Sequence, residues 1–241
     1  MREEAGLRMD QPNTFIERLD KIREKYGAEE FLRGDNEECQ KGREAFFEYW
    51  FILGFKRLSK KDWWILQPKE EFPDLLLVSF EDNPLSMQVL QYEHVMIPDR
   101  YKEVSEMIKN VTDKIEKKRY DTGGPCGLLI FSNSENSRAF EANLYQILNS
   151  IRPFTEVWTT SLEFSDSTTI RKIFVSKVRP HPVIRFEFDF NDQALYAWQK
   201  PPACMEEVEK DGIKSLKLKE EAMLEFRKEA IRRRIRGYQD S

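Results

Sequence analysis

The sequence predicts an α/β (α+β) protein in which a mixed β-sheet is flanked by helices. Three observations predict this class. Apolar residues recur at helical spacing through the first fifty positions. The middle of the chain carries short apolar runs bounded by Pro, Asp and Asn, which is typical of strands. An amphipathic helical segment then separates two such runs, which implies a crossover connection and a parallel strand pair.

Two helices are expected at the start of the chain. Asn13 or Thr14 can cap a helix over residues 15–32, and a Gly-Asp-Asn break follows it. A second helix over residues 38–53 is apolar around much of its surface, so we expect it to be buried. Gly54 is predicted to end this helix as its C′ glycine.

Three extended runs follow, over residues 62–67, 75–80 and 87–97. A short connection that contains Glu-Asp-Asn-Pro joins the second run to the third. Strands joined in this way pair antiparallel, so we predict a hairpin.

The second half of the chain begins with a helix over residues 101–120, which carries one apolar stripe. The continuously apolar run at 126–131 is typical of a strand that is buried on both faces. The remaining expected elements are a helix near 139–151, extended runs at 154–162, 169–178 and 183–190, and a helix over 213–236.

Composition excludes several classes of protein. The 39 Lys and Arg residues against 43 Asp and Glu give a net charge of −4, which excludes a chain that is basic throughout. Three scattered cysteines and two histidines exclude a disulfide framework and a zinc cluster of thiolates or imidazoles. No apolar run approaches the length of a membrane span and no signal peptide is evident, so we expect a soluble, cytoplasmic protein without a membrane partner.

Acidic and amide side chains gather around the predicted hairpin. Asp74 starts one strand, and Gln91 and Glu93 lie two residues apart on the next, so they project from the same face. Pairing of the strands can bring Asp74 close to them. Glu44 and Glu48 share a helix face in an otherwise apolar stretch. Because buried carboxylates are costly unless they are paired or bound to metal, such a cluster would suit Mg²⁺ or Mn²⁺.

This layout resembles the PD-(D/E)XK nuclease superfamily, which has the restriction-endonuclease-like fold. Pro73-Asp74 matches the Pro-Asp of that pattern, and Gln91-Tyr92-Glu93 stands where the family has (Asp/Glu)-x-Lys. Glu44, ten residues before Gly54-Phe55, resembles the helix glutamate of several family branches. The resemblance covers roughly residues 40–135, little more than a third of the chain.

The resemblance implies a metal-dependent nuclease with Asp74, Gln91, Glu93 and Glu44 as catalytic residues. Asp74, Gln91 and Glu93 would hold Mg²⁺ or Mn²⁺, which would polarise a phosphate and activate a water molecule, while Glu93 orients that water. The chain departs from the pattern at two positions, because Gln91 replaces a carboxylate and Glu93 replaces the lysine. A carboxylate cannot stabilise negative charge on a phosphate, although it can accept a proton or bind a second cation.

These observations lead to three hypotheses about function, and the first two share the nuclease-like fold. The chain is a divergent metal-dependent nuclease, or a catalytically inactive nuclease-like fold that acts as a nucleic-acid or protein interaction module. The third hypothesis is an unrelated α/β binding protein. His94 lies on the opposite face of its strand from Glu93 and is interpreted as a histidine packed beneath a helix.

The predicted organisation has three parts. Residues 1–38 form an N-terminal helical extension, residues 39–200 form the mixed-sheet nuclease-like domain, and residues 201–241 form a charged C-terminal helical tail. From Lys217 to Arg236 the tail has eight Lys and Arg against four Glu. It is either a solvated helix or a contact with nucleic acid through its basic cluster, which comprises Arg232, Arg233, Arg234 and Arg236.

Overall fold

A computed structural model describes the fold. The structure describes residues 8–33, 35–66, 74–79, 88–97, 103–117, 125–132, 137–144, 154–166, 169–197, 199–210, 213–225 and 228. The helices are α1 (Pro12–Tyr26), α2 (Ala28–Arg33), α3 (Glu37–Ser59), α4 (Val104–Lys117) and α5 (Ser137–Leu144), with a 3₁₀ turn at Gln193–Tyr196. The strands are β1 (Arg8–Asp10), β2 (Trp64–Leu66), β3 (Leu75–Ser79), β4 (Gln88–Ile97), β5 (Cys126–Ser132), β6 (Glu156–Phe164), β7 (Ile170–Arg179), β8 (Ile184–Asp189), β9 (Met205–Lys210) and β10 (Ile213–Leu218).

The described strands join in one sheet in the order β8-β7-β6-β5-β4-β3-β2-β1-β10-β9. Strands β4, β5 and β6 are parallel to one another, and the other neighbouring pairs are antiparallel. The predicted antiparallel pairing of β3 with β4 is confirmed, with Leu75 opposite Tyr92. The mixed α+β class is therefore confirmed as well.

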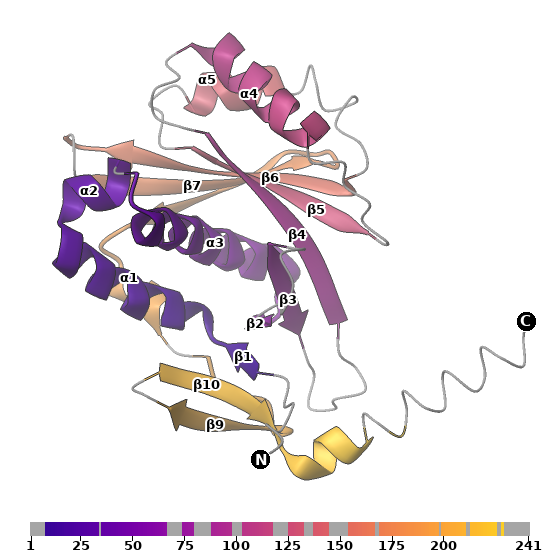
Figure 1. Cartoon of the computed structure of the whole chain (residues 1–241). Helices are drawn as coiled ribbons and strands as arrows, with labels where there is room; N and C mark the ends of the chain where they lie inside the picture. The colour runs from indigo at the N-terminus through magenta and orange to yellow at the C-terminus, as the bar shows by residue number, and fades with distance from the viewer. Residues whose placement is uncertain are drawn as a thin grey trace, which may run out of the picture.

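Helices cover both faces of the sheet (Figure 1). Helix α3 packs on one face through a cluster that is rich in aromatic side chains, including Phe47, Trp50 and Phe51. Helices α4 and α5 pack on the other face, where Met107 and Phe140 join a second core. All seven residues of β5 are buried, as the sequence predicted for a strand covered on both sides.

Helix α3 is longer than the sequence predicted. It starts at its N-cap Asn36, whose side chain accepts hydrogen bonds from the backbone N–H groups of Glu38 and Cys39. It continues past Gly54 to Ser59. The expectation that Gly54 ends the helix was wrong, because this glycine serves a close approach to the sheet. A Cβ at Gly54 would lie 2.6 Å from a methyl group of Val175.

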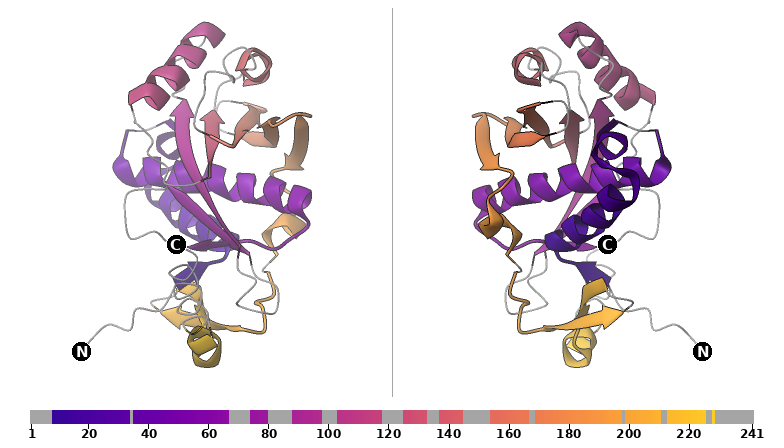
Figure 2. Two further views of the ribbon diagram at one scale, coloured as in Figure 1. Left: turned by 90° about the vertical axis from the view of Figure 1, so that its right-hand side faces the viewer. Right: turned by 90° about the vertical axis from the view of Figure 1, so that its left-hand side faces the viewer.

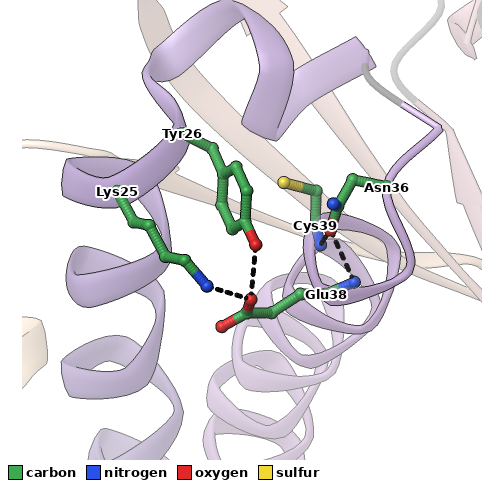
Figure 3. A network of polar contacts seen from close by, with 5 residues as sticks. All are labelled: Lys25, Tyr26, Asn36, Glu38 and Cys39. Atoms are coloured by element: carbon green, nitrogen blue, oxygen red, sulfur yellow. Dashed lines mark hydrogen bonds and ion pairs between the residues drawn. The ribbon is translucent and has the colours of Figure 1, made fainter.

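The first two helices pack against α3. Gly27, with φ of 84°, separates α1 from α2, so the single helix expected over 15–32 is divided. Figure 3 shows Lys25 and Tyr26 of α1 both donating hydrogen bonds of 2.7 Å to one carboxylate oxygen of Glu38. These contacts join the last turn of α1 to the first turn of α3.

The segment that was expected to be helical from Ile213 begins instead with a strand. β9 and β10 form an antiparallel hairpin, and β10 pairs with β1, at one end of the molecule (Figure 2). Leu216 and Leu218 are buried and Lys217 lies between them, an alternation that suits a strand. Residues 220–225 are helical. The basic cluster at 232–236 lies outside the described residues.

Composition also predicted that the chain has no membrane-spanning helix and no disulfide framework. Among the helices that the structure describes, none combines the length and the apolar character needed to cross a membrane. Cys39, Cys126 and Cys204 are buried free thiols.

Candidate functional site: an acidic cluster around His94

The candidate site lies where α3 crosses β4, and His94 of β4 is at its centre. Residues alternate in direction along a strand, so His94 faces α3 together with Tyr92, which packs in the α3-side core. Glu44 and Glu48 lie one helical turn apart on α3 and both point to this histidine. His94 Nε2 is 3.4 Å from Glu44 Oε1, and His94 Nδ1 is 3.6 Å from Glu48 Oε1.

Asp74 reaches the same histidine from the start of β3. It lies just beyond Leu75, the first residue of β3 that pairs with β4. Its Oδ2 atom accepts a hydrogen bond of 2.9 Å from the backbone N–H of His94. The same oxygen lies 3.5 Å from His94 Nδ1. One imidazole therefore contacts three carboxylates, two from α3 and one from the start of β3.

Burial and charge together determine the protonation of this cluster. Burial alone lowers the pKa of His94, but its ion pairs with Glu44 and Glu48 and the charge of Asp74 outweigh this effect and raise that pKa to about 10. The imidazole is therefore a cation at neutral pH. The Glu48 side chain is 9% exposed, and its burial raises its pKa while His94 opposes the shift.

The cluster is held in place by packing as well as by charge. The imidazole stacks on Phe131 of β5, with ring centroids 5.6 Å apart and planes inclined by 24°. Phe131 in turn stacks on Phe47 of α3 at 5.1 Å. Buried ions are costly unless they are paired, so the positive ring between three carboxylates is what makes this arrangement tolerable.

The structure does not bring all the predicted site residues together. Asp74 and Glu44 meet at His94, but Gln91 and Glu93 project from the other face of β4. Glu93 pairs in register with Leu128, which belongs to the core beneath α4 and α5. It is 2% exposed. The expectation that Glu44 and Glu48 converge on the side of Gln91 and Glu93 was wrong, because α3 packs on the Tyr92–His94 face.

Glu93 influences a different group from the one expected. It lies near Cys126 of β5, and burial, followed by the charge of Glu93, raises the pKa of this thiol to about 12. Cys126 is thus a protonated, buried thiol at neutral pH and a poor nucleophile.

A divalent cation does not fit the described donors in the way the resemblance implies. The four predicted residues are divided between two faces of β4. The carboxylates that do converge, Glu44, Glu48 and Asp74, surround the imidazole of His94 instead of meeting Gln91 and Glu93. Within the ranges that the structure describes, no group of three or more His, Cys, Asp or Glu residues has an arrangement that could hold a metal ion.

His94 is the residue that sequence reasoning undervalued. Its position beneath a helix was predicted, but its role as the common partner of three carboxylates was not. A signal was present, since Glu44 and Glu48 share one helix face in an apolar stretch and need a cation there. The sequence did not predict which face of β4 is covered by α3.

Comparisons with protein-family models, with curated proteins and with solved structures gave no match to this chain.

Proposed function

We propose that this protein is a non-catalytic domain of restriction-endonuclease-like fold that acts as an interaction module. In this proposal the imidazolium of His94 is the cation at the point where Asp74 and Glu44, two of the four residues that the resemblance names, meet. The observation that carries the proposal is the placement of His94 within 3.6 Å of carboxylate oxygens from Glu44, Glu48 and Asp74.

The topology supports the fold part of the proposal. A helix that bears Glu44 precedes three antiparallel strands, β2, β3 and β4. Helix α4 then leads to β5, which is parallel to β4. The nuclease pattern has a helix with a glutamate, a strand that follows Pro-Asp, a second strand, a helix and an apolar strand. The elements α3, β3, β4, α4 and β5 follow this order, with Asp74 directly before β3.

The electrostatics support the non-catalytic part. Hydrolysis of a phosphodiester by this family depends on a cation that polarises the phosphate and activates water. Binding such an ion at this cluster would require His94 to lose its proton and to leave its ion pairs. Because the pKa of His94 is about 10, that loss is unfavourable at neutral pH.

A pair of measurements tests this function. Thermal melts of the wild-type protein should not shift on addition of Mn²⁺ or Mg²⁺, since only a ligand that binds the native state raises apparent stability. Incubation with single- and double-stranded DNA and RNA should give no metal-dependent cleavage. A shift of the melt by Mn²⁺, together with cleavage that Asp74→Ala abolishes, would establish the active nuclease instead.

Gln91→Glu provides a matched variant for the melts. In an active site built on Gln91 and Glu93, the added carboxylate would tighten metal binding. In the observed arrangement it adds a charge on the face that carries Glu93, away from His94. We therefore expect Gln91→Glu to melt at a lower temperature than wild type, because like charges crowd together, and to gain no stabilisation from Mn²⁺.

A further inference from the structure

A cavity of about 520 Å³ lies beside the C-terminal end of α3. Its apolar lining includes the buried side chains of Ile52 and Phe188. Four cationic side chains and one carboxylate also line it: Lys56, Arg57, Lys60, Lys61 and Asp62. We call it the cationic cavity. The whole chain has a net charge of −4, so the charge is locally reversed here.

Most of this positive charge is not neutralised by carboxylates. Lys56 forms an ion pair with Asp62 and also donates a hydrogen bond to the side chain of Gln199. Arg57 donates to the backbone carbonyl of Glu187, and Lys61 donates to the side-chain carbonyl of Gln88. Among the residues that the structure describes, Lys56 is thus the one cation of the four whose charge a carboxylate balances.

Arg57 lies over an aromatic ring and is itself exposed to solvent. Its guanidinium carbon lies 4.1 Å from the centroid of the Phe188 ring, and its hydrogen bond to Glu187 fixes the orientation. Phe188 is buried, whereas Arg57 is exposed. A guanidinium that is stacked on one side by a protein ring can stack a nucleobase on the other side.

Lys60 places a charge beside Arg57 at a strained backbone position. It ends α3 with φ of 59°, the left-handed conformation that glycine adopts most easily at this position. Lys56 and Arg57 already provide the cations that favour a helix C-terminus. A third and a fourth cation, Lys60 and Lys61, therefore exceed what the helix end requires.

We infer that the cationic cavity binds a nucleotide unit, with the base stacked on the exposed guanidinium of Arg57 and the phosphate on Lys60 and Lys61. The inference deepens the proposed function and rests on it, because it identifies what the interaction module binds. A cavity of this volume is within the usual range for a small ligand. Either a free nucleotide or a single-stranded nucleic acid supplies this chemistry. In a duplex the base is already stacked and cannot reach Arg57.

The site is separate from the acidic cluster. Arg57 follows Glu48 by nine residues on the same helix, which is about 14 Å along its axis. Substitutions in the cationic cavity therefore leave the His94 cluster unchanged, and the two proposals are tested independently.

The test measures binding with EDTA present, so that metal plays no part. The probes are a fluorescein-labelled single-stranded dT₁₂, dTMP, thymidine and inorganic phosphate, with anisotropy for dT₁₂ and competition for the others. Lys61→Gln and Lys60→Gly should each weaken dT₁₂ binding and reduce its salt slope by about one unit. Arg57→Lys keeps the charge and loses the planar group, so it should weaken dT₁₂ roughly tenfold and leave inorganic phosphate unaffected.

Lys41→Gln is the matched control, because it removes one exposed lysine from the other end of α3. If dTMP displaces labelled dT₁₂ at about the nucleotide concentration that unlabelled dT₁₂ requires, the cavity binds free nucleotides. If only unlabelled dT₁₂ displaces the probe, the cavity binds a single strand. The inference is overturned if dT₁₂ and dTMP both fail to bind. It is also overturned if Lys60→Gly, Lys61→Gln and Lys41→Gln behave alike, or if phosphate competes as well as dTMP. Cleavage of dT₁₂ with Mn²⁺ in a separate assay overturns the non-catalytic function and not the cavity.

Discussion

The charged side chains at the two ends of α3 differ in sign and in how they are paired. In its N-terminal half, Glu44 and Glu48 face the sheet and close around the imidazole of His94 together with Asp74. At its C-terminal end, Arg57 and the two lysines that follow the helix, Lys60 and Lys61, border a cavity and have no described carboxylate partner. At one end, three largely buried or half-buried carboxylates share one imidazolium. At the other end, four cationic side chains face one carboxylate, Asp62, so positive charge is in excess.

The difference indicates which cluster maintains the structure and which is available to a ligand. A buried ion without its partner is expensive, so each member of the His94 cluster depends on the others. An exposed lysine costs the fold little when it is removed, because water solvates its charge. Substitutions at the first end should therefore change stability, and substitutions at the second end should change binding.

The largest effect is expected from His94→Asn. This substitution removes the cation and leaves the carboxylates of Glu44, Glu48 and Asp74 facing a neutral side chain. The free energy of unfolding at pH 7 should fall by about 3–5 kcal/mol, as it does when one partner of a buried ion pair is removed. Denaturant unfolding followed by tryptophan fluorescence measures this loss.

A second substitution distinguishes charge from packing. In the double variant His94→Asn with Glu48→Gln, one buried negative charge is also removed, so part of the lost stability should return. The interaction energy from the double-mutant cycle should be distinctly non-zero. Additive losses from the two single substitutions would show that His94 contributes through its stacking on Phe131 alone.

A more gradual effect is expected from pH, because it is spread over several pH units. The pKa of His94 is raised from 6.5 to about 10 in the folded state. Its contribution to stability is therefore fully present below pH 6.5 and is lost as pH rises through about 10. Between these values the free energy of unfolding should decline by at most about 1.4 kcal/mol per pH unit from this one proton. The decline should be missing from His94→Asn, and an identical slope in both proteins would assign it to other groups.

The smallest effect on stability is expected at the cationic cavity. Lys60→Gly relieves the positive φ at the end of α3, so the protein should be unchanged or more stable by up to about 1 kcal/mol. Lys61→Gln should change stability by less than about 0.5 kcal/mol. Thermal melts of both variants check this. A loss of 2 kcal/mol or more at either position would mean that the cations maintain the helix end rather than serve a ligand.

Much of the architecture could be predicted from local patterns. The apolar run from Leu75, the extended run around Tyr92 and the short connection between them specified the β3–β4 hairpin, and the continuous apolar run from Cys126 specified a strand buried on both faces. Gly54 was misread because a glycine that ends a helix and a glycine that permits close packing against Val175 look the same in sequence. The strand at Ile213–Leu218 was missed because its charged stretch was interpreted as the start of a helix, although its hairpin partner β9 precedes it directly and only its pairing with β1 joins residues two hundred positions apart.

The candidate site could be predicted only in part. Asp74, Glu44 and Glu48 were identified by type and position, since carboxylates beside apolar residues require a partner. The identity of that partner depends on which face of β4 the helix covers, and this follows from the packing of aromatic residues such as Phe47 and Phe51 against the whole sheet. The cationic cavity depends on the approach of β8 to α3, which no local pattern shows.

The protonation of His94 at neutral pH is the central claim, and NMR of the imidazole nitrogens tests it most directly. The chain contains only two histidines, so the His94→Asn spectrum assigns the signals. We predict that both His94 nitrogens are protonated at pH 7 and that the ring titrates near pH 10. A neutral His94 ring at pH 7, or resonances that shift when a diamagnetic divalent cation such as Mg²⁺ is added, would contradict the account and favour a metal site among these carboxylates.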